Sequence, residues 1–289
     1  MDKKNIVWIA SYPKSGNTWF RLFLSNIMNN GDYPVNINSI IGEIASNREL
    51  FDEITGVPSS ILCKKEILRL RPEVYRYIAN KSEKLIFFKI HDAWRYVDYQ
   101  VPLVPQSVTK AVIYLIRNPL DIVVSYSYHL NLPVDEVVKN LNDDNYSISP
   151  DVDSLKVQLE QKLFSWRKHV LSWINLSKLK IHIVKYEYLI QKPFDTFKKA
   201  ISFIGMNLAD NEIKKAISFS EFRILREQEI NHGFIERSPS STLFFRKGQI
   251  EQWKNALSKK QIDMVIRKNY FVMKKFGYIS DLSDLPPKN

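Results

Sequence analysis

The chain of 289 residues contains a single cysteine, Cys63, so it cannot form an internal disulfide bond. A chain without disulfides is typical of a reducing compartment. The segment around this residue, 61–70, has the pattern of an amphipathic helix. We therefore expect the thiol of Cys63 to be a small buried apolar group rather than a reactive one.

Long apolar runs are also missing. No stretch approaches the roughly 18 apolar residues that a membrane-spanning helix requires. The apolar segment near the first residue, 5–10, is too short for the core of a secretory signal peptide. We therefore expect a soluble, cytoplasmic protein without a membrane partner.

The sequence also lacks internal repeats and a linker that would divide it, so we expect residues 1–289 to form a single domain. The chain does have a basic excess, with 42 Lys and Arg against 31 Asp and Glu and a net charge of +11. Such an excess indicates either an anionic partner or a solvated, lysine-rich surface.

Four apolar runs of strand length recur along the chain, at residues 5–10, 85–90, 111–116 and 181–186. Their nearly continuous apolarity predicts strands that are buried on both faces. Helical patterns occupy residues 18–30, 119–130, 154–175, 193–205, 209–229 and 258–278. This alternation predicts an α/β fold with a central parallel sheet flanked by helices, in which ligands bind beyond the carboxyl ends of the strands.

Two long polar segments interrupt the pattern, at residues 131–153 and 231–245. Long loops inside a compact domain are usually functional. We predict that 131–153 is a mobile insertion and that 231–245 is a loop over a bound cofactor.

The segment SYPKSGNTW, residues 11–19, lies between the first predicted strand and the first predicted helix. Backbone N–H groups at a helix N-terminus bind phosphate well, and Lys14 adds a positive charge. The order differs from the common nucleotide loop G-x-x-x-x-G-K-[ST], because Lys14 precedes Gly16. The alternative interpretation is an ordinary strand-to-helix turn.

Polar side chains also mark the ends of two other predicted strands. Arg117 ends one strand, and Ser125 follows two helical turns later, so that a guanidinium and a hydroxyl can clamp phosphate. An ion pair between Arg117 and Asp121 is the alternative. Lys89 and His91 share one face of another strand end, where acid–base groups gather. Alternatively, His91 is a hydrogen-bonded, partly buried histidine.

A basic cluster of Arg246, Lys247 and the flexible Gly248 follows the second polar segment. A run of charges is usually a solvated surface. The three other segments that suit an anion favour a functional interpretation of this cluster as well.

Together the four segments resemble the motifs of the cytosolic type of sulfotransferase, whose sulfuryl donor is 3′-phosphoadenosine 5′-phosphosulfate (PAPS). The family's YPKSG-[TN]-TW, R-N-P-x-D-x-x-V-S and K-x-H are matched by 12-YPKSGNTW-19, 117-RNPLDIVVS-125 and 89-KIH-91. Its R-K-G-x-x-G-D-W-K-N is matched by 246-RKGQIEQWKN-255, where Glu and Gln replace Gly and Asp. The resemblance implies a single-domain, P-loop-like sulfotransferase fold.

The resemblance also implies roles for residues of this chain. The 5′-phosphosulfate would be held by Lys14, Ser15, Gly16, Asn17 and Thr18. The 3′-phosphate would be surrounded by Arg117, Ser125, Arg246, Lys247 and Gly248. The adenine would contact Trp19, on whose face it would stack, and Tyr186, Ser220 and Phe222. His91 would be the general base for the acceptor, while Lys89 and Lys14 would stabilise charge on the transferring sulfuryl group and the leaving phosphate.

We expect a small-molecule acceptor that presents a hydroxyl group in preference to an amine. Asp92, Trp94 and Tyr128 are the predicted acceptor contacts, and Tyr96, Tyr126 and His129 are further candidates for an aromatic pocket. Each of these aromatic residues could instead be core packing. The usual dimerisation motif of the family is not evident in 258–278, so both a monomer and a homodimer remain open.

Two other functions fit the sequence less well than sulfuryl transfer. A P-loop nucleotide kinase would need a GK[ST] loop and a carboxylate that holds Mg²⁺, and the first is absent. A nucleic-acid-binding module would need basic residues on one helix or stripe, whereas here they are scattered. We therefore expect no nucleic-acid partner, and no metal, because fixed Lys and Arg can supply the positive charge.

Overall fold

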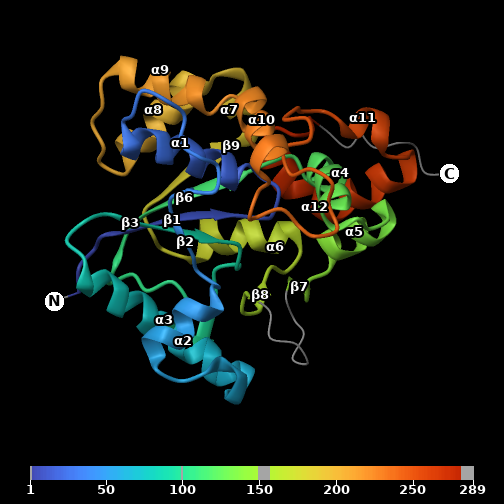
Figure 1. Ribbon diagram of the computed structural model, residues 1–289. Coiled ribbons are helices and arrows are strands. Elements are labelled where there is room, and N and C mark those ends of the chain that lie inside the picture. The colour runs from blue at the N-terminus through green and yellow to red at the C-terminus, as the bar shows by residue number, and fades with distance from the viewer. Residues whose placement is uncertain (1, 99, 149–156, 281–289) are drawn as a thin grey trace.

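The computed structural model of the chain describes residues 2–98, 100–148 and 157–280 (Figure 1). Its centre is a five-stranded sheet in the order β2–β3–β1–β6–β9, in which every neighbouring pair is parallel. The strands are β1 (Ile6–Ser11), β2 (Glu43–Ile44), β3 (Ile86–Ile90), β6 (Thr109–Ile116) and β9 (Ile181–Lys185). The predicted α/β fold with a central parallel sheet is confirmed, and within this sheet the sequence pattern did not predict the two-residue edge strand β2.

The sheet is buried on both faces, as its continuous apolar strands require. In β1, Trp8 joins the core cluster on one face, while its neighbours Val7 and Ile9 join the cluster on the other. In β6, Tyr114 and Ile113 divide in the same way. Because side chains alternate across a strand, both faces must be covered, and this forces helices onto each of them.

One face is covered by α1 (Asn17–Asn29), α7 (Tyr186–Gln191), α8 (Pro193–Phe203) and α9 (Asp210–Phe219). The other is covered by α3 (Lys64–Lys81), α4 (Pro119–Leu130), α5 (Val134–Asn142), α6 (Trp166–Leu171) with the π-helical η2 (Ser172–Leu176), and α12 (Lys259–Lys275). Figure 1 shows α1, α8 and α9 on one side of the strands and α3 and α6 on the other. No described helix is both long and apolar enough to cross a membrane.

The remaining elements are short or lie at the edges. They are α2 (Arg48–Thr55), η1 (Ser59–Ile61), α10 (Phe222–His232), α11 (Trp253–Ala256), β4 (Tyr96–Asp98), β5 (Val101–Pro102), β7 (Ser147–Ile148) and β8 (Gln161–Lys162).

The helix predicted over 154–175 is wrong for its first described part. Residues 157–165 form no helix, and Phe164 has a φ of 58°. Here the backbone pairs with distant segments: the N–H of Leu159 donates to the carbonyl of Ser46, and the N–H of Phe164 donates to that of Tyr146. Tertiary pairing therefore overrides the helical pattern, and α6 begins only after Ser165, whose side chain caps it. Residues 154–156 lie outside the described part.

The single helical segment predicted over 209–229 is two helices, α9 and α10. The break falls at Ser220, whose carbonyl accepts a hydrogen bond from the indole Nε1 of Trp19 at 2.8 Å. A helix can end where a side chain satisfies its last carbonyl groups. The indole of α1 therefore meets the end of α9 at the point where the chain turns into α10.

One further expectation, that for Cys63, needs correction, and the insertion predicted at 131–153 contains a helix. Cys63 is exposed and precedes α3 at its N-cap position, so it is not a buried apolar group. In the polar segment 131–153, residues 134–142 form α5, which buries Val137, Val138 and Leu141 against the core. Residues 149–153 lie outside the described part, and the mobility of this segment stays a prediction.

Candidate active site

A cavity of about 980 Å³ lies at the carboxyl edge of the sheet, and all four motif segments line it. Strands β1, β3 and β6 are parallel neighbours, so the segments that follow them meet at this edge. The predicted site residues that line the cavity are Lys14, Gly16, Asn17, Thr18, Trp19, Lys89, His91, Arg117, Ser125, Tyr186, Phe222, Arg246, Lys247 and Gly248. Parallel topology therefore brings together residues up to 234 positions apart (248 − 14).

The loop between β1 and α1 is a tight turn. Lys14 and Gly16 both have left-handed backbones, with φ of 66° and 97°. A Cβ on Gly16 would lie 2.8 Å from the ring of Tyr186, so the close approach of that ring requires glycine here. Asn17 secures the turn, because its side-chain amide donates to the carbonyl of Ile9 at 2.8 Å.

The ammonium of Lys14 lies 4.0 Å from the centre of the Phe244 ring. Burial, followed by the positive charges of Arg117 and Lys89, lowers the pKa of Lys14 to about 7. A lysine whose charged form is this poorly stabilised gains free energy when an anion binds beside it. A negatively charged ligand beside Lys14 would therefore be stabilised by this side chain and would raise its pKa.

Arg117 connects the loop to the basic segment near the other end of the chain. Its guanidinium donates to the carbonyls of Lys14 and Gln249, both at 3.0 Å, and lies 4.1 Å from the centre of the Tyr186 ring. The alternative ion pair with Asp121 is not formed, because that carboxylate accepts the N–H groups of residues 251 and 253. Arg117 therefore holds two anion-suited segments side by side.

The last motif keeps its turn despite its departures from the family pattern. Glu251, which stands where the family has Gly, has a left-handed φ of 61°. Its N–H donates to the carboxylate of Asp121 at 2.7 Å. The turn therefore has the backbone that glycine prefers, with a glutamate in its place.

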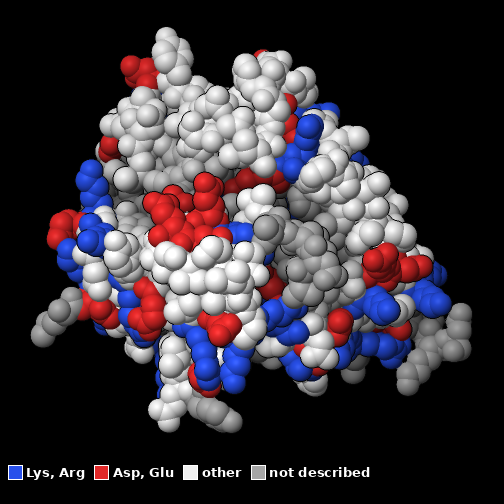
Figure 2. Space-filling model, turned by 60° about the horizontal axis from the view of Figure 1, so that its bottom comes forward, with Lys and Arg blue, Asp and Glu red and all other residues white. Residues whose placement is uncertain are grey.

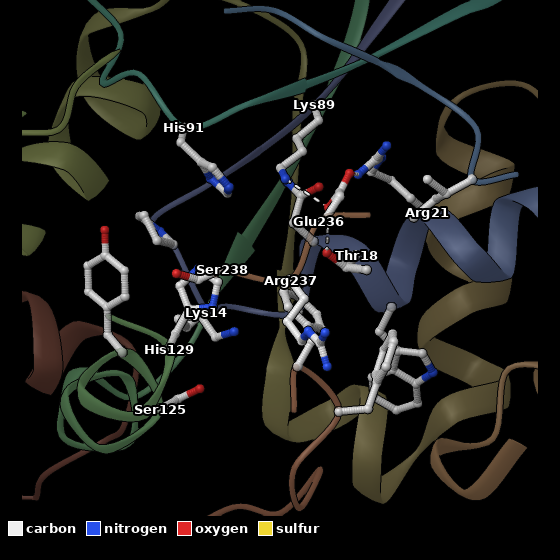
Figure 3. A pocket seen from close by; sticks show the side chains of 18 of the residues that line it. Lys14, Thr18, Arg21, Lys89, His91, Ser125, His129, Glu236, Arg237 and Ser238 are labelled. Atoms are coloured by element: carbon white, nitrogen blue, oxygen red, sulfur yellow. Dashed lines mark hydrogen bonds and ion pairs between the residues drawn. The ribbon is translucent and has the colours of Figure 1, made fainter. Parts of the chain in front are cut away.

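His91 has the geometry of a general base. Its Nδ1 lies 2.8 Å from the carbonyl oxygen of Ser11, which can only accept, so Nδ1 carries the proton and Nε2 is free to receive one. Burial, then the charge of Lys89, lowers the pKa of His91 to about 3. Figure 3 shows the ring pointing into the cavity from the end of β3. The imidazole is therefore neutral at physiological pH and directed at the cavity.

The backbone around His91 is held by groups that the sequence did not reveal. His169 Nε2 donates to the carbonyl of His91 at 3.0 Å, and its Nδ1 accepts from the hydroxyl of Tyr114 at 2.8 Å. The indole Nε1 of Trp173 donates to the carbonyl of Asp92 at 3.1 Å. These side chains come from β6, α6 and η2, and together they fix the end of β3.

Asp92 was predicted to contact the acceptor, and the structure contradicts this. Its side chain is fully buried, away from the cavity, and pairs with the guanidinium of Arg71 at 2.7 Å. It also accepts the N–H of Lys162 at 3.1 Å. The chain has left β3 at Ile90, and the side chain of Asp92 is turned into the core, so Asp92 is a structural residue.

Trp94 and Tyr128 are likewise absent from the cavity lining. Trp94 is buried in the core on the α3 face. Tyr128 is 57% exposed, and its ring lies 4.0 Å from the guanidinium of Arg246 on the outer side. Of the further aromatic candidates, Tyr126 and His129 line the cavity and Tyr96 does not. A helix places successive residues on different faces, which separates Tyr126 from Tyr128.

Ser15 and Ser220 were predicted to contact the donor, but neither side chain lines the cavity, and both are fully buried. The Ser220 hydroxyl donates to the carbonyl of Ala216 and accepts from Asn26. The Ser15 hydroxyl is buried without a hydrogen-bond partner among the described residues. A contact from Ser15 would therefore come from its backbone N–H.

The sequence interpretation missed an ion network on the opposite wall from His91 (Figure 3). Glu236 pairs with Arg21 at 2.6 Å and with Lys89 at 3.0 Å, and it accepts the hydroxyl of Thr18 at 3.2 Å. Arg21 follows Thr18 by three residues, so both share one face of α1. The spacing from Thr18 could have predicted that Arg21 lies near the site. No motif around Glu236 predicts that it reaches the cavity.

A parallel α/β sheet with a basic loop and an imidazole at its carboxyl edge is the arrangement of a group-transfer enzyme with a phosphorylated donor. The sulfotransferase domain family matches residues 4–277, so the chain belongs to this family. The predicted enzyme class, a sulfotransferase, is thereby confirmed.

Relatives of known activity agree with this assignment. Mouse sulfotransferase 1B1 is 27% identical over 90% of this chain and 81% of its own length. Flavonol 3-sulfotransferase of Flaveria bidentis is 25% identical over 90% of this chain and 79% of its own.

Solved structures share the fold. Mouse sulfotransferase SULT7A1, solved with PAP, has a TM-score of 0.56 and 21% identity over 98% of this chain and 88% of its own. Retinol dehydratase, solved with androsterone and PAP, has a TM-score of 0.61 and 16% identity over 94% and 81%.

Proposed function

We propose that this protein transfers a sulfuryl group from PAPS to a hydroxyl of a small-molecule acceptor, with His91 as the general base. One observation carries the proposal: the free Nε2 side of His91 and the cationic loop around Lys14 face the same cavity. PAPS would supply the activated sulfuryl group and leave as 3′-phosphoadenosine 5′-phosphate (PAP).

The side chains present fit such a donor. Lys14 and Thr18 at the start of α1 would hold the 5′-phosphosulfate, together with the N–H groups of the turn. Arg117, Ser125 and the 246–248 segment would surround the 3′-phosphate. A Cβ on Gly248 would lie 2.4 Å from the Phe222 ring, so this segment and that ring form one tight wall.

The adenine would lie between rings already arranged around the cavity. Trp19 is fixed by its hydrogen bond to Ser220 and meets the Tyr186 ring edge-on at 6.1 Å. Trp19 and Phe222 both line the cavity, and their rings would offer aromatic faces on which a purine can stack. This is why an aromatic residue follows the phosphate loop directly.

His91 would accept the acceptor's hydroxyl proton at Nε2 as the oxygen attacks sulfur. Its low pKa keeps the ring unprotonated, and Ser11 keeps the correct tautomer. Lys89 and Lys14 would stabilise the negative charge that develops on the departing phosphate. Pairing with the departing anion favours the protonated form of Lys14.

The acceptor would bind on the side of the cavity away from Trp19. Tyr126, His129 and Leu130 of α4 line the cavity, as does Ile44 from the edge strand, and these residues would contact the acceptor. The mixture of apolar walls and a few polar groups suits a modest organic molecule. We propose a cytoplasmic enzyme, either monomeric or homodimeric, without a nucleic-acid partner. Figure 2 supports the last point, since Lys and Arg are interspersed with Asp and Glu on the face shown.

A screen of hydroxyl- and amine-bearing compounds with ³⁵S-labelled PAPS tests the proposal, with products identified by mass spectrometry. We expect sulfated products from small hydroxyl compounds. Acceptance of proteins or long polysaccharides alone would contradict the acceptor class. Absence of transfer to any compound, together with absence of PAP binding, would contradict the donor.

A further inference from the structure

Glu236 places a carboxylate inside the cavity, where the surrounding groups suit an external anion. Its side chain is 9% exposed and accepts from Arg21, Lys89 and Thr18 at 2.6, 3.0 and 3.2 Å. Burial by itself raises the pKa of Glu236, but the charges of Lys89 and Arg21 outweigh this and hold the pKa well below its usual range. The carboxylate is therefore ionised at neutral pH.

The three donors form a rigid anion site. Arg21 is buried, and its Nε and Nη2 donate to the carbonyls of Ile41 and Gly42, both at 2.9 Å. These bonds fix the guanidinium, so that Nη1 points into the site, where Glu236 now lies. Thr18 belongs to the phosphate loop, and Lys89 lies on β3 two residues before His91. The site therefore adjoins both the predicted phosphosulfate position and the predicted base.

Glu236, by contrast, comes from the segment 231–245, which is anchored at its ends. Glu229 on α10 accepts the N–H groups of Phe244 and Phe245 at 2.7 and 2.8 Å.

The backbone beside Glu236 is held as well: the side-chain amide of Asn38 donates to the carbonyl of Gly233 at 3.3 Å and accepts the N–H of Ile235 at 2.9 Å. Phe234 is buried in a core cluster between them. We therefore expect Glu236 to leave the site by rotation of its side chain.

We propose that Arg21, Lys89 and Thr18 bind the phosphosulfate end of the donor, and that Glu236 occupies this subsite until the donor displaces it. The inference rests on the proposed function and adds Arg21 to the donor-binding residues. The hydroxyl of Thr18 can donate its hydrogen bond to Glu236 or to a phosphate oxygen of PAPS. A carboxylate and a phosphate bound at the same site would repel each other. PAPS therefore binds there only when the carboxylate of Glu236 leaves the site.

Isothermal titration calorimetry of the full chain with PAP tests this exchange in the Glu236→Gln variant. Glutamine keeps the size of the side chain and removes the competing charge. We expect PAP to bind at least about tenfold more tightly than to the wild type. The matched control is Glu227→Gln, because Glu227 is exposed on α10 and its loss changes the net charge equally. That control should bind PAP as the wild type does.

Equal or weaker PAP binding by Glu236→Gln, relative to Glu227→Gln, would overturn the inference, because Glu236 would then support the site. If Glu236→Gln fails to fold without ligand, Glu236→Asp replaces it: the shorter carboxylate reaches the three donors less well. Its affinity for PAP should exceed that of the wild type, and an unchanged or lower affinity overturns the inference. If the wild type itself does not bind PAP, the proposed function fails first, which distinguishes the two failures.

Discussion

The two ends of the cavity are built in different ways. The proposed donor end is lined by residues from three short motif segments, at positions 13, 14 and 16–19, 117 and 125, and 246–248. The proposed acceptor end is lined by Ile44 from β2 and by Tyr126 and His129 from α4. Phosphate is bound by backbone N–H groups and clustered charges, so the residues that bind it stand close together in the sequence. An organic acceptor is recognised by the shape of its pocket, which is formed by side chains from separate elements.

His91→Ala should have the largest effect, because it removes the proposed general base. Loss of a general base lowers kcat by about 10²- to 10⁴-fold. PAP affinity should stay within a few-fold, since His91 carries no charge that the donor needs. Steady-state kinetics and calorimetry measure the two quantities, with the exposed His232→Ala as control. Normal turnover in His91→Ala would remove this residue as the base.

Asp92→Asn tests whether the neighbour of His91 belongs to the acceptor end or to the core. It leaves Arg71 buried without its charge partner, and breaking such a pair costs about 3 kcal/mol or more. Urea denaturation should show this loss in the free energy of unfolding. The KM of the acceptor should not change at a temperature where the variant is folded, whereas His129→Phe, at the cavity wall, should change it. A large KM change in Asp92→Asn alone would return this residue to the acceptor site.

Arg117→Ala tests the donor end. It removes a charge-assisted contact to the donor, and such contacts are worth about 1.5–3 kcal/mol, or roughly 10- to 150-fold in affinity. The variant also loses the bonds that join Lys14 to Gln249. Calorimetry with PAP measures the change, with the exposed Arg223→Ala as control. Unchanged PAP affinity would refute the assignment of Arg117 to the 3′-phosphate.

The pH dependence of PAP binding tests the charge of the donor end. Because the pKa of Lys14 is about 7 in the unliganded protein, its side chain is mostly the neutral amine at pH 8–9. An anion binds the charged form, so binding takes up a proton above pH 7, and affinity should fall by up to about tenfold per pH unit. Calorimetry in two buffers of different ionisation enthalpy measures this uptake. In Lys14→Arg, which stays charged, the dependence should flatten. Proton release in the wild type would contradict the prediction.

Glu251→Gly should have the smallest effect. It relieves a left-handed backbone that costs a non-glycine residue about 1 kcal/mol. This gain is offset in part by the greater flexibility of glycine in the unfolded chain and by loss of the exposed Lys254 ion pair. We expect a rise of a few degrees or less in the melting temperature. Glu251→Ala, which keeps the strained backbone, should show no such rise; equal stabilisation in both variants would contradict the explanation.

The sequence predicted most of the donor end and little of the acceptor end. Lys14, Arg117 and Gly248 line the cavity as their motifs indicated. Asp92 and Trp94 do not, although they lie one and three residues after His91, because their side chains are buried in the core. Around His91 the errors therefore fall where a prediction relied on proximity in sequence alone.

The sequence by itself determined the parallel sheet, the phosphate loop and the family, because periodic apolarity and contiguous motifs are local signals. Only the tertiary structure decided that Glu236 reaches Arg21 and Lys89, that His169 holds the backbone of His91, and that residues 157–165 form no helix. The first two are contacts between segments far apart in the chain, and residues 157–165 form no helix because their backbone pairs with other segments. Their free energy depends on burial and distance, which become defined only when the sheet brings the segments together.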